Sequence, residues 1–514
     1  MLAAGTPMID TGARGRGGSL SNAFANWINF FVSAILGLIV NPLLLQFLGV
    51  NAFGAWKGTQ RVLDLAGVVD GRSAQALKWV VAHRHSSATT EEKRRDVGAS
   101  LIFGLMMSPI LLLACTIMVL SLPVLIQDVP SEYADAMYVA GALLGANVVL
   151  RGLLMVPDAV LVGTNQGYRS MNLTTVFLVL SNVAMVLAAF AGWGIASFGL
   201  IVLVSSLGNA AATWIVARRR VTWWGFARPT RDDVRRVGGF SAWSMGWRVV
   251  NQSLASVDGI LIGALVGAAA ITQFTFTSYV VTFSYALAQA TTSALMPGLG
   301  RSIGSGADDE ATARVRQVGY VNLWIVATAA GLVLALNGGF VTIWAGEDMF
   351  MGQLFNMLLV ACFVQVSLTR NSSQIQDAAL KIRRRVVVGL ISTIVSIALA
   401  ILGFTVAGEP YGILIGLLIG RLPMMIIYRL EVDRIVPGGR ARNSSFLFAG
   451  ALLAIAAMIG FWMPALPTIP WLAVATCFAA SFAAATWFLI LPKGLRQVLV
   501  KVAVNRLPKR FKRS

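Results

Sequence analysis

Fourteen long apolar stretches separated by short polar loops restrict the fold of this 514-residue chain more than any other feature. Each stretch is about 20 residues long, the length at which an α-helix crosses the roughly 30 Å hydrocarbon core of a bilayer. Hydrophobic residues make up 57% of the chain and charged residues only 12%, which leaves too little polar surface for soluble domains. The sequence therefore predicts an all-α polytopic membrane protein with 14 transmembrane helices.

The loops between these segments alternate between basic and base-free. We number the segments 1 to 14 and place them at 20–48, 53–81, 97–126, 137–163, 171–192, 195–217, 238–264, 268–298, 318–344, 350–377, 386–406, 411–429, 446–463 and 470–492. Lys and Arg occur only in every second loop, as in cytoplasmic loops of membrane proteins. Both termini are therefore predicted to lie on the cytoplasmic side of a bacterial-type inner membrane. This distribution indicates that the formal net charge of +19 reflects contact with the membrane surface rather than binding of nucleic acid.

Segments 4 and 10 share an unusual pattern that indicates an internal repeat. Arg151 is followed by Asp158-Ala-Val-Leu, and Arg370 is followed by Asp377-Ala-Ala-Leu. Six segments separate the two copies, and an even separation preserves orientation, so two pseudo-symmetric parallel bundles are expected. The predicted organisation is a cytoplasmic leader (1–19), an N-terminal six-helix bundle (20–217), a cytoplasmic connector (218–237), a C-terminal six-helix bundle (238–430), an extra C-terminal pair of transmembrane helices (446–492) and a basic cytoplasmic tail (493–514).

Two surface features are expected outside the membrane. In the connector, Thr230 and Asp233 have the spacing that caps a short helix. The tail carries eight bases and no acid, and its apolar residues recur at helical spacing, which predicts an interfacial helix on anionic membrane lipid.

Segment 2 carries charges that a lipid-facing helix cannot hold. Lys57, Arg61 and Asp64 lie at positions i, i+4 and i+7 and so share one helical face. A charge exposed at the bilayer centre costs about 2.5–3.5 kcal/mol, so this face is expected to meet protein or water. Because Asp64 cannot neutralise both bases, the surplus cation needs an anionic partner, and a phosphate or pyrophosphate would provide one.

Segment 7 repeats this arrangement, and the uncharged polar residues of segment 8 suit sugar hydroxyls and ring faces. The predicted substrate-binding residues are Arg61, Arg248, Arg151, Lys57, Arg370, Asn251, Gln252 and Tyr279. The candidates for proton or cation coupling are Asp64, Asp158, Asp258 and Asp377. For the pairs Arg151–Asp158 and Arg370–Asp377, the alternative is a salt bridge within one helix, in which the two charges only neutralise each other.

The three cysteines fall in apolar stretches and the two histidines in a basic loop, so no cofactor, metal site or disulfide framework is predicted.

The run NPLLLQFLGVNAFGAWKGTQRVLDLAGVVDGRSAQALKWVVA, residues 41–82, resembles the Wzx-type polysaccharide-repeat flippases. Their superfamily also holds multidrug exporters and the lipid II flippase. Further matches are 293–310 and the Trp-x-Gly in 340–346. The resemblance implies two six-helix bundles around a cavity, alternating access, and a polyprenyl-diphosphate-linked glycan as the cargo. It also implies cationic cavity residues at Arg61, Arg151 and Arg248, and other polysaccharide-assembly membrane proteins as candidate partners.

This chain departs from the family pattern at two places. The usual Asp-Leu-Gly at the end of segment 2 is here Asp70-Gly71-Arg72. Segment 1 lacks both the charged pair expected of a lipid II flippase and the acid expected of a cation-coupled drug exporter. A multidrug or cation-coupled exporter is one alternative, although such a protein would favour an acidic cavity. A membrane glycosyltransferase or polymerase is the other, although the chain shows no large outer loop, nucleotide fingerprint or metal-ligand cluster for catalysis, and no enzyme is predicted.

Overall fold

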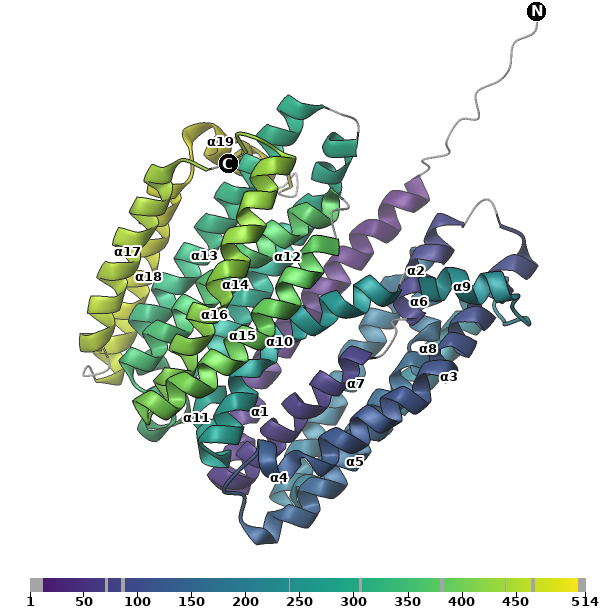
Figure 1. Cartoon of the computed structure of the whole chain (residues 1–514), viewed down its shortest axis with the longest axis horizontal. Coiled ribbons are helices and arrows are strands. Elements are labelled where there is room, and N and C mark those ends of the chain that lie inside the picture. The colour runs from purple at the N-terminus through teal and green to yellow at the C-terminus, as the bar shows by residue number, and fades with distance from the viewer. Residues whose placement is uncertain are drawn as a thin grey trace, which may run out of the picture. The chain divides into compact units, whose positions relative to one another are not determined.

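The computed structural model describes residues 13–69, 73–84, 88–239, 241–304, 307–379, 383–439, 441–463 and 467–506. Within these ranges all regular secondary structure is helical, as predicted (Figure 1). The chain divides into two compact units, Met1–Val249 and Val250–Ser514. The boundary lies inside α10 (Ser241–Leu265), and therefore within predicted segment 7 rather than within the connector.

The first unit contains nine complete α-helices and the beginning of α10. They are α1 (Ala13–Ala66), α2 (Ser73–His83), α3 (Thr90–Leu120), α4 (Leu122–Leu125), α5 (Ser131–Leu154), α6 (Val156–Gly163), α7 (Gly167–Phe190), α8 (Gly194–Arg220) and α9 (Arg231–Gly239), and the 3-10 turn η1 (Gly67–Val69) follows α1.

The second unit contains the remainder of α10 and the helices that follow it. They are α11 (Ala268–Thr277), α12 (Tyr279–Gly304), α13 (Asp308–Ala345), η2 (Glu347–Met349), α14 (Gln353–Ala378), α15 (Arg383–Ala407), α16 (Pro410–Ile435), α17 (Asn443–Trp462), α18 (Thr468–Ile490) and α19 (Lys493–Arg506).

Eleven helical stretches of the described chain are long and apolar enough to cross a membrane, whereas the sequence predicts fourteen. Segments 1 and 2 count once because α1 runs through both, with a sharp bend at Gly49 where φ is 76°. Such a positive φ is readily adopted only by glycine. Segment 7, which is α10, and segment 8, which breaks at Ser278 into α11 and α12, are not among the eleven. The other predicted segments coincide with helices, and the count of fourteen stays a prediction.

The connector folds back onto the first unit instead of hanging free. Arg94 Nε on α3 donates to the carbonyl of Trp223 at 3.1 Å, and Ala227 N donates to the carbonyl of Arg94 at 3.0 Å. A Cβ at Gly98 would lie 2.1 Å from the Ala227 carbonyl oxygen, so only glycine allows this approach. The backbone of residues 223–227 therefore lies directly against α3.

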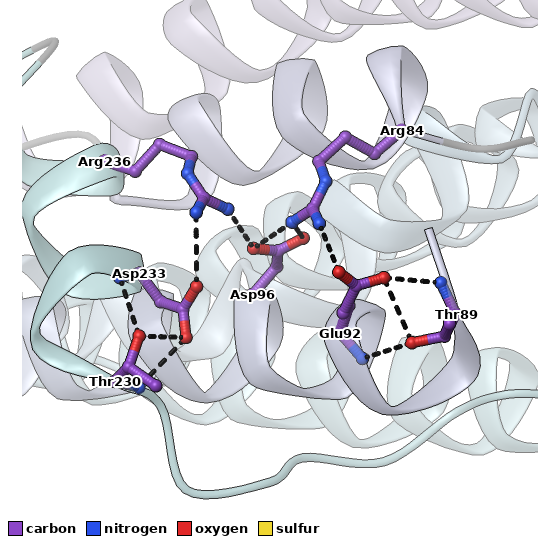
Figure 2. Close-up of polar contacts among 7 residues, drawn as sticks. All are labelled: Arg84, Thr89, Glu92, Asp96, Thr230, Asp233 and Arg236. Carbon is purple, nitrogen blue, oxygen red and sulfur yellow. Dashed lines mark hydrogen bonds and ion pairs between the residues drawn. The ribbon is translucent and has the colours of Figure 1, made fainter. Parts of the chain in front are cut away.

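The predicted cap of α9 is confirmed by a reciprocal pair of hydrogen bonds. Thr230 N donates to Asp233 Oδ2 at 2.9 Å, and Asp233 N donates to Thr230 Oγ1 at 3.2 Å (Figure 2). Burial alone would raise the pKa of Asp233, but the hydrogen bonds from Thr230 and the charge of Arg236 outweigh it and hold this pKa below its usual value. The cap thus favours the ionised carboxylate.

Asp96 joins α2, α3 and α9 through a buried carboxylate. Its two oxygens accept from Arg84 Nη1 at 3.2 and 2.9 Å, and Arg236 of α9 approaches to 3.5 Å (Figure 2). Asp96 is 1% exposed, whereas the side chains of Arg84 and Arg236 are 24% and 45% exposed. One carboxylate therefore holds two cations from segments far apart in sequence.

Replacing Asp96 with alanine is expected to destabilise the first unit by about 2 kcal/mol. Loss of one partner from a buried pair can cost about 3–5 kcal/mol, and this figure is reduced because both arginines are partly solvated. Thermal unfolding of the purified protein measures the effect, and hydrogen exchange should rise in residues 221–239. Asp232→Ala, at an exposed position of α9, is the matched control. An unchanged melting temperature in Asp96→Ala would contradict this role.

The second unit contains an unusually close helix pair, α15 and α16. Gly412, Gly416 and Gly420 recur every fourth residue on α16 and face α15. A Cβ at Gly416 would lie 2.1 Å from the Leu399 carbonyl oxygen, and one at Gly420 would lie 2.3 Å from Ser396 Cα. Small residues at this spacing allow backbones to meet in membrane helices. Arg421 directly follows Gly420 on α16, and this packing places Arg421 in the core.

The extra C-terminal pair packs on α13 and belongs to the second unit. A Cβ at Gly331 of α13 would collide with the Phe482 ring, and one at Gly339 with Trp471 Nε1. The hydroxyls of Thr328 and Thr486 lie 2.8 Å apart across the same interface. The pair α17 and α18 is thus joined to the bundle by close contacts along α13.

The tail forms a helix, α19, as predicted up to Arg506, and residues 507–514 lie outside the described part. Leu495 and Leu499 pack against Tyr320 and Leu491 of the second unit, whereas Val498 is 49% exposed. Part of the apolar face predicted to lie on lipid is therefore covered by protein. Of the predicted leader, residues 1–12 also lie outside the described part.

Candidate functional site

The first unit brings together four of the charged residues predicted from the sequence. Lys57, Arg61 and Asp64 lie on α1 after its bend, and Arg151 lies near the end of α5. The carboxylate of Asp64 is within electrostatic range of both Arg61 and Arg151, and Arg61 acts in turn on Lys57. Arg61 follows Gly49 by 12 residues, which is about 18 Å of helix. We call this group the first-unit cation cluster. It contains three bases and one acid within membrane-spanning helices.

Asp158 does not pair with Arg151. Its carboxylate forms a 2.9 Å ion pair with Lys78 of α2 and accepts a 2.6 Å hydrogen bond from Ser170 Oγ. The helix breaks at Met155 between Arg151 and Asp158, so the two residues are on different helices, α5 and α6. The alternative of a salt bridge within one helix is therefore wrong for this pair, and Arg151 is left to interact with Asp64.

The corresponding pair in the second unit does not form a salt bridge either, although Arg370 and Asp377 both lie on α14 without a helix break between them. Asp377 forms a 2.7 Å ion pair with Arg385 of α15, whose side chain is 1% exposed. Arg370 instead interacts through its guanidinium with Tyr285 of α12. The salt bridge within one helix is wrong here too, and in both repeats the aspartate binds a base from another helix.

The second unit contains a small, partly open cavity of about 100 Å³ between α10, α12, α14 and α16, with a mainly apolar lining. Asp258, Tyr285 and Arg421 line it. Arg421 is 3% exposed, and none of the ion pairs found in the described chain involves it. We did not predict Arg421, although a lone arginine in the middle of apolar segment 12 is a readable signal. The cavity is therefore lined by Asp258, an acid that the sequence analysis predicted, and by Arg421, a base that it did not predict.

A larger cavity of about 330 Å³ lies inside the first unit between α1, α7 and α8. Its polar lining is formed by Asn41, Lys57 and Gln60 of α1, Thr174, Ser181 and Asn182 of α7, and Ser205, Ser206 and Asn209 of α8. We call it the first-unit pocket. Only Lys57 among these residues was predicted to bind substrate, because uncharged polar residues scattered through segments 5 and 6 leave no pattern in the sequence.

The remaining predicted residues lie on α10 and at the start of α12. Arg248 is half-buried and engaged in contacts. Asn251 Oδ1 is buried without a hydrogen-bond partner, and Gln252 Nε2 donates to Ser256 Oγ at 2.9 Å. Tyr279 packs against Trp344 with ring centroids 4.9 Å apart. Asp70 and Arg72 lie outside the described residues, and the described part of the chain holds no cluster of potential metal ligands.

Comparison with known proteins gives one family and one fold. Residues 106–314 match the model of a family described as polysaccharide biosynthesis protein. The lipid II flippase MurJ in an inward closed conformation is similar, with a TM-score of 0.66 and 12% identity over 90% of this chain and 97% of that chain. No curated protein matches the sequence.

Two further transporters share this fold. An inward-facing multidrug resistance MATE family transporter of the MOP superfamily has a TM-score of 0.64 and 13% identity, covering 78% of this chain and 95% of that chain. A MOP superfamily transporter from Pyrococcus furiosus, described as having a binding pocket of reverse polarity, has a TM-score of 0.54 and 15% identity, covering 84% and 99%. At these identities the likeness shows the fold alone.

Proposed function

We propose that this chain, a polytopic membrane protein of the polysaccharide and lipid-linked flippase family, moves a polyprenyl-diphosphate-linked oligosaccharide to the outer leaflet. The family is supported by the match over residues 106–314 and by the fold shared with the lipid II flippase. The proposed cargo would serve the synthesis of a cell-surface polysaccharide. The membrane would be a bacterial-type inner membrane, with both termini on the cytoplasmic side.

The first-unit cation cluster is the observation that carries this proposal. Arg61 and Arg151 both lie within electrostatic range of the Asp64 carboxylate, and Lys57 lies near Arg61, so Asp64 is the single acid among the charges named at this site. Surplus positive charge within spanning helices is costly unless an anion neutralises it. A diphosphate supplies such charge, and the planar fork of an arginine can bind phosphate oxygens through two parallel hydrogen bonds.

In the proposed cycle the diphosphate binds these bases from the cytoplasmic leaflet while the prenyl tail stays in lipid. A change between inward and outward states then exposes the headgroup outside. Moving a charge through the membrane potential changes the free energy by about 2.3 kcal/mol per charge per 100 mV. Binding to bases that move with the cargo would reduce the net charge that crosses.

Asp64 and Asp258 are the better candidates for ion coupling within this proposal. Asp158 and Asp377 are each held in an ion pair, so their carboxylates already have a fixed counter-ion. Asp64 is exposed, and Asp258 borders the small cavity of the second unit, where water or a cation could reach it. We further propose that the exposed bases of α19 bind anionic lipid.

The multidrug exporter stays a second candidate because the fold is shared with MATE transporters. A cavity for cationic drugs would need surplus acid, which the first-unit cation cluster lacks. The solved relatives described above are transporters and flippases, and nothing in this comparison favours a glycosyltransferase or polymerase.

Transport by the purified protein in liposomes tests the proposal. A fluorescent polyprenyl-diphosphate oligosaccharide is incorporated, and crossing between leaflets is followed with a membrane-impermeant quencher. We expect protein-dependent crossing of this carrier and none of a matched carrier joined through a neutral ether instead of the diphosphate. Equal crossing of both carriers would contradict the cationic site. Export of a cationic dye without any lipid crossing would favour the drug-exporter alternative.

A further inference from the structure

The first-unit pocket lies at the middle of the membrane-spanning helices. Ser181 follows the start of α7 by 14 residues and Ser205 follows the start of α8 by 11, which places them about 21 and 16 Å along their helices. All of the lining residues belong to the first unit. A ligand here would therefore meet polar groups from three helices at a depth where an empty polar cavity is costly.

The two serines Ser181 and Ser205 present acceptors to the pocket because their hydroxyl protons are already used. Ser181 Oγ donates to the Leu178 carbonyl and Ser205 Oγ to the Phe177 carbonyl, at 3.1 and 3.2 Å. A hydroxyl has one proton, so both oxygens keep free lone pairs toward the pocket. The amide nitrogen of Asn182 donates one of its two hydrogens to the Leu178 carbonyl at 2.8 Å, and its side-chain oxygen is a further acceptor. The pocket is thus suited to a ligand with several hydrogen-bond donors.

One acceptor of the pocket has no partner at all. Asn209 Nδ2 donates to Thr174 Oγ1 at 3.4 Å, while Asn209 Oδ1 is buried and accepts no hydrogen bond within the described chain. Leaving a buried acceptor unpaired costs about 1–3 kcal/mol in stability, so such an atom points to a missing donor. A ligand hydroxyl or water could supply this donor.

Lys57 is the one charged residue among those lining the pocket. Its ammonium lies 5.3 Å from the centroid of the Phe53 ring, a contact that attracts a cation without neutralising it. The nearby charge is Arg61, which has the same sign, and none of the ion pairs found in the described chain involves Lys57. The pocket therefore needs one anionic group at Lys57 and neutral donors elsewhere.

We infer that the first-unit pocket binds an acidic sugar residue, a pyranose bearing a carboxylate, within the glycan that is transported. A sugar ring supplies hydroxyl donors for the serine and asparagine oxygens, and its carboxylate pairs with Lys57. The buried Trp56 adds an aromatic wall, which suits the apolar faces of sugar rings. This inference rests on the proposed function, because it assigns part of the cargo to a second site.

Size and lining chemistry distinguish this ligand from the diphosphate. A volume of about 330 Å³ is at the lower end of the roughly 300–1,000 Å³ of small-molecule sites, so it admits a single ring rather than an extended chain. Ionised phosphate offers acceptors almost exclusively, and these would face the acceptors of Ser181, Ser205 and Asn209. A sugar hydroxyl satisfies the same atoms.

Binding of free sugars to the full-length protein in lipid nanodiscs tests the inference without any transport step. Titration calorimetry would compare glucuronate, glucose and inorganic phosphate. We expect glucuronate to bind at least about tenfold more tightly than glucose, as a charge-assisted hydrogen bond predicts. Lys57→Gln should remove this difference, and Lys493→Gln, a lysine exposed on α19, should preserve it.

A second variant covers the case in which Lys57→Gln does not fold. Ser181→Leu keeps the lysine and fills the pocket from α7, so both sugars should lose binding while the protein stays monodisperse. Equal affinities for glucose and glucuronate in the wild type, or tighter binding of phosphate than of glucuronate, would overturn the assignment. If glucuronate binds but no lipid carrier crosses, the pocket stands and the flippase proposal fails. If carriers cross while glucuronate does not bind, the reverse holds.

Discussion

Arg61→Ala is expected to slow crossing of a polyprenyl-diphosphate oligosaccharide by about 10- to 100-fold while the protein still inserts and folds. Hydrogen bonds to charged groups contribute about 1.5–3 kcal/mol, which corresponds to this range of rates if the contact forms during transport. Arg61→Lys keeps the charge but loses the planar fork, so only part of the rate should return. The liposome assay described above measures all three proteins at equal abundance.

The control for this prediction is Arg219→Ala, which removes an exposed arginine at the end of α8 in the same unit. Its rate should equal that of the wild type. Arg151 shares the carboxylate of Asp64 with Arg61, so the effects of Arg61→Ala and Arg151→Ala should not add. A wild-type rate in the double variant would remove the first-unit cation cluster from the mechanism.

Gly416→Leu is expected to prevent stable folding of the second unit. The Cβ that it introduces would lie 2.1 Å from a backbone oxygen of α15, and backbone cannot rotate away as a side chain can. Overpacking usually costs about 1–3 kcal/mol, and a forced separation of two helices along their length costs more. We expect loss of monodisperse protein on size-exclusion chromatography and a lower melting temperature in any protein that is recovered.

Gly450→Leu on α17 is the matched control, because a Cβ there meets no atom within 4 Å. It makes the same chemical change on an exposed part of a helix in the same unit. Recovery of both variants at equal yield and equal melting temperature would show that the α15–α16 contact is not the constraint that we describe.

Hydropathy predicted the helices well because a span in lipid must form its backbone hydrogen bonds within itself. The length and composition of an apolar segment therefore indicate a helix. The eleven long apolar helical stretches differ from the fourteen predicted segments where one helix passes through a bend, as at Gly49, and where a segment breaks, as at Ser278. Neither event changes composition. The fold class therefore followed from the sequence, whereas the exact number of spans stays a prediction.

The charged residues also divide into those whose arrangement the sequence predicts and those that only the fold brings together. The face shared by Lys57, Arg61 and Asp64 was predictable because its spacing is local. The partner of Asp158 was not, since Lys78 is 80 residues away in the chain and pairs with it only through the fold. Arg421 could have been found as a lone charge in an apolar segment. The serines and asparagines of the first-unit pocket could not, because membrane helices often carry such residues bonded to their own backbone.

The bend at Gly49 has a consequence for anyone who engineers this protein. Asn41 and Lys57 lie on either side of it and line the same pocket, so the two halves of α1 run side by side there. Gly49 alone has non-helical backbone angles at this turn, so the connection between the two halves has little spare length. An epitope tag inserted at this turn would lengthen the connection between the two halves of α1 that line the pocket. It would thereby shift one half along the other. Antibody or protease mapping of the outer surface should therefore place its insertions elsewhere, although this turn looks from the sequence like an ordinary loop.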